Sequence, residues 1–104
     1  MISSLKIIEP QTEEQFELYY ELRWEVLRKP WGKSRGSERN QCDSSGFHRM
    51  IIDESHNPLS VGMLVINSDQ EAQIRFMAVR TNCQGMNIGS LIMQELESLA
   101  QEKK

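Results

Sequence analysis

Cysteine, histidine and proline are scarce in this 104-residue sequence, which has two cysteines, two histidines and three prolines. Cys42 and Cys83 do not form a C-x-x-C pair, and His48 and His56 are isolated, so no group has the spacing of a zinc site. We therefore expect no metal, and a core that forms without disulfides in a reducing, cytoplasmic compartment.

Long hydrophobic runs and an excess of positive charge are also missing. No apolar segment approaches the length of a membrane span, and no basic start followed by an apolar block forms a secretory signal. The net charge of −3 argues against nucleic acid as the main partner. One local basic cluster is interpreted as a solvated helix end and loop: Arg23, Arg28, Lys29, Lys33, Arg35 and Arg39.

The residue pattern predicts one small domain over residues 1–104, which begins with a strand and a helix. Leu5 to Ile8 favours a short β-strand. Thr12 and Gln15 have the form of a capping box, which starts a helix that reaches about Lys29. The apolar stripe of this helix consists of Phe16, Tyr19, Tyr20, Val26 and Leu27, widened by Leu18 and Leu22.

A loop and three strands are expected next. The loop extends from Trp31 to Ser45, with one helical turn near Glu38 to Cys42. The strands are predicted at Phe47–Asp53, Ser60–Ile66 and Ala72–Val79, as an antiparallel meander with a candidate bulge at Gly62.

The last predicted element is a helix from about Gly85 to Glu102. One apolar face of this helix is made of Ile88, Leu91, Ile92, Leu96 and Leu99. The segment Phe76–Leu91, which leads into the helix, is the part of the sequence most informative about function. It combines an apolar strand, a polar loop with two glycines and the start of a helix.

A phosphate group suits such a junction, because the N–H groups of a first helical turn lack intrahelical partners and the helix dipole adds positive charge. Two known phosphate motifs are excluded. A Walker loop needs a lysine, which Ile88-Gly89-Ser90 lacks, and the dinucleotide fingerprint needs three glycines in a parallel βαβ unit.

The segment Gln84-Gly85-Met86-Asn87-Ile88-Gly89 resembles the acyl-CoA-binding motif of the GNAT superfamily of N-acyltransferases, Gln/Arg-x-x-Gly-x-Gly/Ala. It matches at Gln84 and Gly89, and Met77-Ala78-Val79 is similar to the strand end that precedes the motif. The order of predicted elements resembles this family over essentially the whole chain. The resemblance implies an α+β, sandwich-like fold with a mixed, mostly antiparallel sheet of about four strands, equivalent to the N-terminal portion of a GNAT fold.

The resemblance also implies how acetyl-CoA is bound as a co-substrate. Backbone groups of the strand end would pair with the pantetheine arm, and the N–H groups from Gly85 to Ser90 would surround the pyrophosphate. The implied binding residues are Met77, Ala78, Val79, Gln84, Gly85, Met86, Asn87, Ile88, Gly89 and Ser90. Small residues at Gly85 and Gly89 allow phosphate to approach the main chain, although a tight strand-to-helix turn alone also explains them.

Two departures from the family pattern stand out. Asn87 occupies the place of the usual first glycine, where asparagine tolerates a left-handed backbone better than other side chains do. The family's next strand, which forms the other wall of the acyl-CoA slot, has no counterpart before Lys104. A shortened chain, a sheet completed by a neighbouring subunit and a relative without catalysis all stay open. The exposed edge expected at residues 72–79 favours a homodimer.

The predicted function is the transfer of an acetyl group from acetyl-CoA to an amine of unknown identity. The alternatives are a non-catalytic CoA-binding or protein-interaction module and a plain structural domain. Glu71, Arg75 and His48 are polar candidates near the sheet, but each is better explained as a surface or strand-pairing residue, so no catalytic residue is assigned. Residues from Trp31 to Asp43 are expected to form one wall of the acceptor site, and Cys83 is expected to be inert packing.

Overall fold

The central element is a four-stranded sheet, seen in a computed structural model that describes residues 5–103. Its strands are β1 (Lys6–Ile8), β2 (Phe47–Ile52), β3 (Pro58–Ser68) and β4 (Glu71–Val79), paired in chain order. All three pairings are antiparallel, which confirms the predicted α+β class and meander, and no parallel pair occurs among the described strands. Residues 1–4 and 104 of the predicted domain lie outside the described part.

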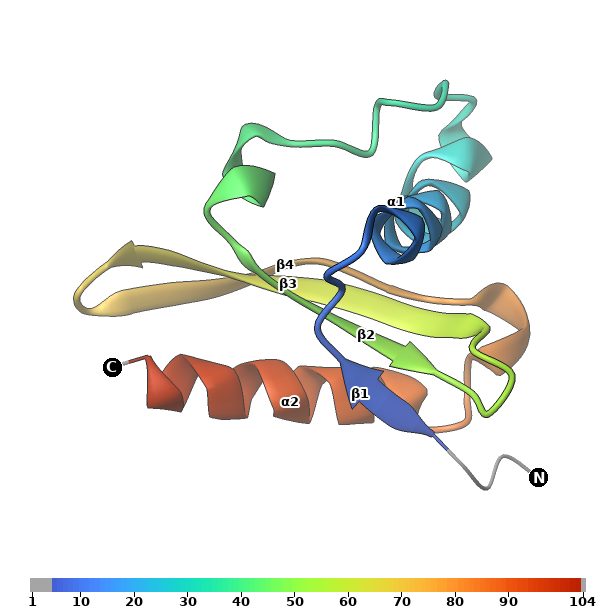
Figure 1. The fold of residues 1–104 in the computed structure, drawn as a ribbon. Helices are drawn as coiled ribbons and strands as arrows, with labels where there is room; N and C mark the ends of the chain where they lie inside the picture. Colours follow the sequence, from blue (N-terminus) through green and yellow to red (C-terminus); the bar gives the residue numbers. More distant parts are fainter. Residues whose placement is uncertain (1–4, 104) are drawn as a thin grey trace.

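Two helices cover opposite faces of this sheet, with α1 (Glu13–Leu27) on one side and α2 (Ile88–Glu102) on the other (Figure 1). Each face carries its own cluster of buried side chains. The α1 side contains Tyr19, Tyr20, Leu22, Met50, Ile52, Val61 and Ala78. The α2 side contains Ile51, Leu59, Leu64, Cys83, Ile88, Ile92, Leu96 and Leu99. Strand β3 contributes to both clusters because successive side chains point to opposite faces.

Helix α1 begins as its sequence predicts. Thr12 Oγ1 accepts a hydrogen bond from the Gln15 N–H at 3.0 Å, and Gln15 Oε1 accepts one from the Thr12 N–H at 3.2 Å. The helix ends at Leu27, slightly before the expected Lys29, because a short 3₁₀ turn containing Pro30 follows it, η1 (Lys29–Trp31).

The segment from residue 28 to residue 46 arches over the α1 side of the sheet (Figure 1). It contains the 3₁₀ turn η2 (Gln41–Ser44), which lies slightly later in the chain than the turn expected near Glu38 to Cys42. Reciprocal hydrogen bonds between Asn40 and Asp43 fix the start of η2. This turn stands above the sheet (Figure 1), where Asp43 reaches Arg23 in α1.

A bulge interrupts the pairing of β3 and β4. Val61 pairs with Ala78, whereas Met63 pairs with Arg75, so β4 carries one extra residue opposite Gly62. The sequence predicted a bulge at Gly62, but the additional residue belongs to β4. Phe76 has the left-handed φ of 53° in this bulge.

Helix α2 begins at Ile88, after the predicted start at Gly85, because Gly85 and Asn87 both have positive φ (86° and 64°). The short turn η3 (Thr81–Cys83) connects β4 to this loop. Four of the five residues predicted for the apolar face are buried, but Leu91 is 38% exposed at its margin.

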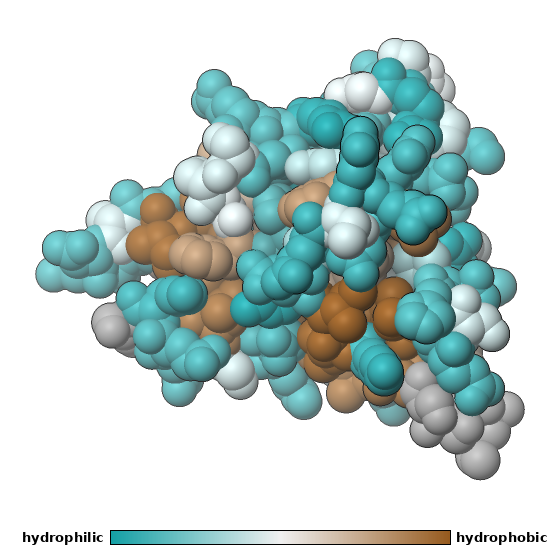
Figure 2. Space-filling view, in the orientation of Figure 1, coloured by the Kyte–Doolittle hydropathy of each residue, from teal (hydrophilic) through white to brown (hydrophobic). Residues whose placement is uncertain are grey.

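Most of the surface in the orientation of Figure 1 is hydrophilic (Figure 2). Apolar surface gathers at the left, where the β3–β4 hairpin lies, and at the lower right near β1 and β2 (Figure 2). Ile66 and Ile7, at these two ends, are each about two-fifths exposed (40% and 41%).

Candidate functional site

The junction between β4 and α2 contains most of the residues predicted to bind a phosphate. A cleft of about 280 Å³ lies there, lined by Val79, Gln84, Gly85, Asn87, Gly89 and Ser90. The predicted set is thus brought together around one hollow, apart from Met77, Ala78, Met86 and Ile88.

Left-handed backbone gives this loop its shape. Gly85 has φ of 86° and no atom within 4 Å of the place where a Cβ would stand, so the glycine serves the conformation and not close packing. Asn87 is the N-cap of α2 with φ of 64°, and its side chain makes no capping hydrogen bond. The first N–H groups of α2 consequently have neither a side-chain cap nor intrahelical partners.

Gly89 is not required by packing within the protein. A Cβ added there would meet Val79 Cγ2 at 3.5 Å, which is an ordinary van der Waals distance. The absence of a side chain leaves space in the cleft, beside the free N–H groups of the helix. This arrangement suits an anion that approaches the main chain.

The remaining loop side chains have different surroundings. Gln84 Nε2 donates to the Val79 carbonyl at 3.2 Å, which ties the loop to the strand end. Ile88 is only 1% exposed and packs in the core, so only its backbone faces the loop, whereas Met86 is 47% exposed. Cys83 is buried among apolar side chains, as expected for inert packing.

The end of β4 presents backbone groups along an edge that pairs with no other described strand. The Arg80 N–H donates to the Leu59 carbonyl of β3 at 2.8 Å. Because successive residues direct their backbone groups to alternate edges, Met77 and Val79 direct theirs away from β3, while Ala78 faces β3. Two of the three predicted strand residues therefore offer hydrogen-bonding groups at the open edge.

A buried polar cluster lies on the other side of the sheet, under η2, and its main member was misinterpreted from the sequence. Arg23 was assigned to a solvated basic cluster, but its side chain is fully buried. Its guanidinium binds both carboxylate oxygens of Asp43 at 3.0 and 3.1 Å and the Glu38 carbonyl at 3.1 Å. Asp43 and the Glu38 carbonyl, from the segment above the sheet, make this burial tolerable together with the tyrosine rings of α1, and those contacts are not visible in sequence.

Tyr19 and His48 extend this cluster. The Tyr19 hydroxyl accepts from Arg23 at 3.2 Å and lies 2.8 Å from His48 Nδ1. His48 Nε2 lies 2.8 Å from the Asp43 carbonyl, which can only accept, so Nε2 carries the proton and Nδ1 accepts from Tyr19. Both ring nitrogens are therefore occupied, and His48 is a buried residue of β2 that pairs with Met63 of β3, which agrees with the expected strand-pairing role and not with a surface position.

Burial controls the protonation of this cluster. Desolvation lowers the pKa of His48 below its ordinary value and raises the pKa of Tyr19 well above its ordinary value. The neighbouring Arg23 charge further disfavours a charged imidazole. His48 is thus held neutral, consistent with the tautomer assigned from its hydrogen bonds.

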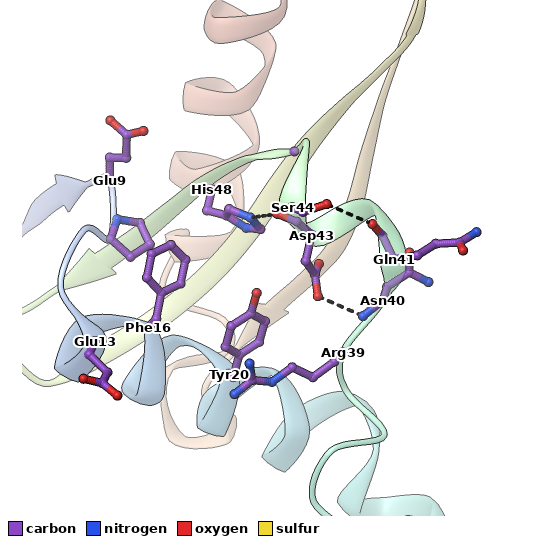
Figure 3. Close-up of a pocket in the computed structure, with 12 residues that line it drawn as sticks. Glu9, Glu13, Phe16, Tyr20, Arg39, Asn40, Gln41, Asp43, Ser44 and His48 are labelled. Atoms are coloured by element: carbon purple, nitrogen blue, oxygen red, sulfur yellow. Dashed lines mark hydrogen bonds between the residues drawn. The ribbon is translucent and has the colours of Figure 1, made fainter.

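A hollow of about 770 Å³, larger than the β4–α2 cleft, adjoins this cluster. Figure 3 shows Phe16 and Tyr20 of α1 on one side and the segment from Arg39 to Ser44 on the other, with His48 between them. Glu9 and Glu13 stand at its outer end (Figure 3). None of the residues predicted to bind acyl-CoA lines it, so it is separate from the β4–α2 cleft.

Of the other polar candidates, Glu71 is exposed at the β3–β4 hairpin and accepts from Asn67 at 3.0 Å, as a surface residue does. Arg75 is half-buried and donates to Cys42 Sγ at 3.5 Å. Trp31 is 78% exposed and lines none of the hollows described here.

Neither a metal nor a membrane span is indicated by the described part of the chain. Residues 5–103 contain no group of three or more potential ligands from histidine, cysteine, aspartate and glutamate. In the same range, no helix combines the length and the apolar character that crossing a membrane requires.

Solved structures of acetyltransferases share this fold. A GNAT-family acetyltransferase from Staphylococcus aureus Mu50 is 16% identical, with a TM-score of 0.75 over 96% of this chain and 68% of that one. A Lactobacillus plantarum protein provisionally classed as an N-acetyltransferase is 19% identical, with a TM-score of 0.82 over 97% of this chain and 70% of its own. The glucosamine-6-phosphate N-acetyltransferase of Arabidopsis thaliana is 14% identical, with a TM-score of 0.69 over 97% and 77% of the two chains.

The sequence itself matches one family model, which is described as the acetyltransferase (GNAT) family, over residues 16–104. This range includes α1 from Phe16 onward, the segment above the sheet, strands β2 to β4 and all of α2. The chain therefore belongs to the GNAT family of acetyltransferases.

Proposed function

We propose that this chain binds acetyl-CoA where β4 meets α2 and transfers its acetyl group to an amine. Membership of the GNAT family implies the use of acetyl-CoA. The observation that best supports the position is the cleft in which the uncapped start of α2 meets the open edge of β4.

The residues of the cleft fit a pyrophosphate. The first turn of α2 has free N–H donors, and the missing side chain of Gly89 leaves them accessible. Packing within the protein does not require a glycine there, because a Cβ would make only an ordinary contact. No acidic side chain lines the cleft. Asn87 takes the left-handed conformation that a glycine would otherwise supply. The loop therefore keeps its shape with asparagine in place of the family's usual glycine.

The open edge of β4 supplies the second half of the proposed site. Acetyl-CoA brings an activated thioester, and the strand can hold its pantetheine arm as an added strand. An N–H group directed away from β3, as at Met77 and Val79, can polarise the thioester carbonyl when the amine attacks. The attacking amine must be neutral, so a proton leaves it before or during the attack.

Acetyl-CoA binding and turnover test the proposal. Calorimetry should show binding of acetyl-CoA, and a panel of amines should include one that releases free thiol. Gly89→Val fills the cleft and should abolish binding, whereas Ser98→Val, on an exposed position of the same helix, should not change it. Equal binding by wild type and Gly89→Val would contradict the proposed position.

A non-catalytic CoA-binding module is the second candidate. Two observations favour it, because neither residue is placed to take a proton from an amine. Both ring nitrogens of His48 are already occupied, and Glu71 is exposed at the β3–β4 hairpin, away from the β4–α2 cleft. Binding of acetyl-CoA without thiol release from any amine would support this module and reject the transferase.

A further inference from the structure

A second, smaller cavity lies on the α1 side of β4 and is lined by arginines. It has a volume of about 310 Å³, and its lining includes Arg23, Arg28, Arg39, Arg75, Glu38 and Phe76. The lining therefore contains four arginines but only one carboxylate, that of Glu38. This concentration of positive charge contrasts with the net charge of −3 of the whole chain.

The bulge in β4 creates this cavity wall. Successive residues of a regular strand point to opposite faces, but the extra residue lets Arg75 and Phe76 both face α1. The Phe76 ring contacts two cations, with the guanidinium carbons of Arg23 and Arg75 at 4.7 and 4.8 Å from its centroid. The ring thereby holds two charged groups side by side at the edge of the sheet.

The arginines differ in how far their charges are neutralised. Arg23 is paired with Asp43, and Arg39 Nε contacts Glu38 Oε2 at 3.3 Å. Arg28 and Arg75 have no carboxylate within ion-pair distance among residues 5–103.

Donors also remain unused. The Nε atoms of Arg23 and Arg28 are both buried and have no hydrogen-bond partner in the described part of the chain. A buried donor without a partner is unfavourable, and an anion in the cavity would satisfy such groups. Charge and unsatisfied donors are two independent observations that point to the same kind of ligand.

The position of the cavity relates it to acyl transfer. It reaches β4 at Arg75 and Phe76, while the β4–α2 cleft reaches the same strand at Val79. At about 3.3 Å per residue, these contacts lie about 10 Å apart along the strand. An extended arm held between them would have its phosphate end at the cleft and its acyl end toward the arginines.

We propose that the arginine cavity binds the anionic group of the acceptor, so that the acceptor is an amine carrying a carboxylate or a phosphate. The identification as an acceptor site rests on the proposed transferase function, whereas anion binding by the cavity does not. The planar guanidinium groups match both carboxylate and phosphate oxygens, and the shared feature is the negative charge near the amine.

Matched ligand pairs test this proposal by calorimetry in the absence of acetyl-CoA. Phenylalanine is compared with phenylalaninamide for the carboxylate, and phosphoethanolamine with ethanolamine for the phosphate. At least one anionic member should bind about tenfold or more tightly than its neutral partner, with the affinity decreasing as salt is added.

Variants then place the binding. Arg28→Gln and Arg75→Gln should each lower the affinity for the anionic ligand about tenfold, because each removes one charged donor. Lys33→Gln removes the same charge from an exposed position outside the cavity and should leave the affinity unchanged. Thermal melting of the wild type and the three variants identifies any variant that is not folded. If one arginine variant is not folded, the affinity of the other arginine variant is the test.

The outcomes separate the two proposals. Equal binding of charged and neutral members in both pairs, or an unchanged affinity in both folded arginine variants, would overturn the arginine cavity. If an anionic member binds there but no thiol is released when acetyl-CoA is added, the cavity is an anion site and the transferase proposal fails. If neutral amines release free thiol from acetyl-CoA as fast as their anionic partners do, the acceptor does not need an anionic group and the inference is wrong.

Discussion

At the scale of single residues, a substitution of Gly89 should change the stability of the fold and the affinity of the cleft in opposite directions. Gly89→Ala should stabilise the free protein by roughly 0.5–1 kcal/mol, because alanine is the better helix residue and its Cβ meets Val79 at 3.5 Å, without a clash. The same Cβ should weaken acetyl-CoA binding by narrowing the approach to the main chain. Urea unfolding and calorimetry on one sample measure both effects.

Gly85 provides the contrasting control for that prediction. Its surroundings are open, but φ of 86° is unfavourable for alanine, so Gly85→Ala should destabilise the protein by about 1 kcal/mol. If Gly89→Ala lowered stability as Gly85→Ala does, Gly89 would be a structural glycine and the argument for an open cleft would be lost.

His48 gives a prediction on pH. Its pKa is lowered in the folded protein by burial, so the unfolded chain binds more protons once the pH falls below the ordinary histidine pKa of about 6.5. Stability should therefore decrease as the pH falls through about 6.5 toward the folded-state pKa, and the contribution is fully present above that range. Urea unfolding at about pH 7.5 and about pH 5.5 measures the difference.

Two variants assign this pH dependence. His48→Gln should flatten the profile, whereas His56→Gln, at an exposed turn, should retain the wild-type decrease. A wild-type slope that persists in His48→Gln would show that a different group is responsible.

At the scale of elements, the contact between β3 and α2 depends on Gly62. A Cβ there would lie 2.8 Å from Leu96 Cδ1, and Leu96 is fully buried, so it has no free space to move into. Gly62→Ala should thus destabilise the protein by about 1–3 kcal/mol. Chemical denaturation measures this value, and the penalty should shrink when Leu96→Ala is already present, because the clashing methyl group is gone.

The coupling of the two substitutions is the critical measurement. Additive effects of Gly62→Ala and Leu96→Ala would mean that the two residues do not meet, contrary to the packing of α2 on the sheet.

The elements themselves could be predicted because their signals are local. Thr12 and Gln15 define the start of α1 within four residues, and the period of Ile88, Ile92, Leu96 and Leu99 defines one face of α2. The extra residue of β4 could not be predicted, because a bulge is a matter of register between two strands and both strands read as regular on their own.

The candidate site was predictable to a similar extent. The β4–α2 loop was identified because its glycines and its strand-to-helix order are neighbours in sequence. The burial of Arg23 was missed because its partners, Asp43 and the Glu38 carbonyl, come from another segment and fold over it. A single arginine on a tyrosine-rich helix face, one turn after Tyr19, was the only available signal.

At the scale of the whole molecule, the edge of β4 that faces away from β3 pairs with no strand of the described structure. We propose that two copies pair along residues 72–79, since an open edge strand offers unpaired N–H and carbonyl groups. The pantetheine arm is proposed to use part of the same edge. Sedimentation should therefore show a dimer that acetyl-CoA shifts toward the monomer.

A protein that sediments as a monomer at all concentrations would contradict the pairing. A dimer that persists unchanged with saturating acetyl-CoA would place the interface elsewhere on the molecule.

The bulge also divides β4 into two halves that are out of phase. On the hairpin side, Ile74 packs against the α2 cluster and Arg75 turns to α1, whereas on the cleft side Met77 packs against the α2 cluster and Ala78 belongs to the α1 cluster. Deleting the extra residue, Phe76, would join the two halves into one regular alternation in which Arg75 still faces α1 and Ile74 still faces α2. The extra residue therefore leaves the faces of both halves as a regular strand would have them, and what it adds is one more side chain, the Phe76 ring, on the α1 face.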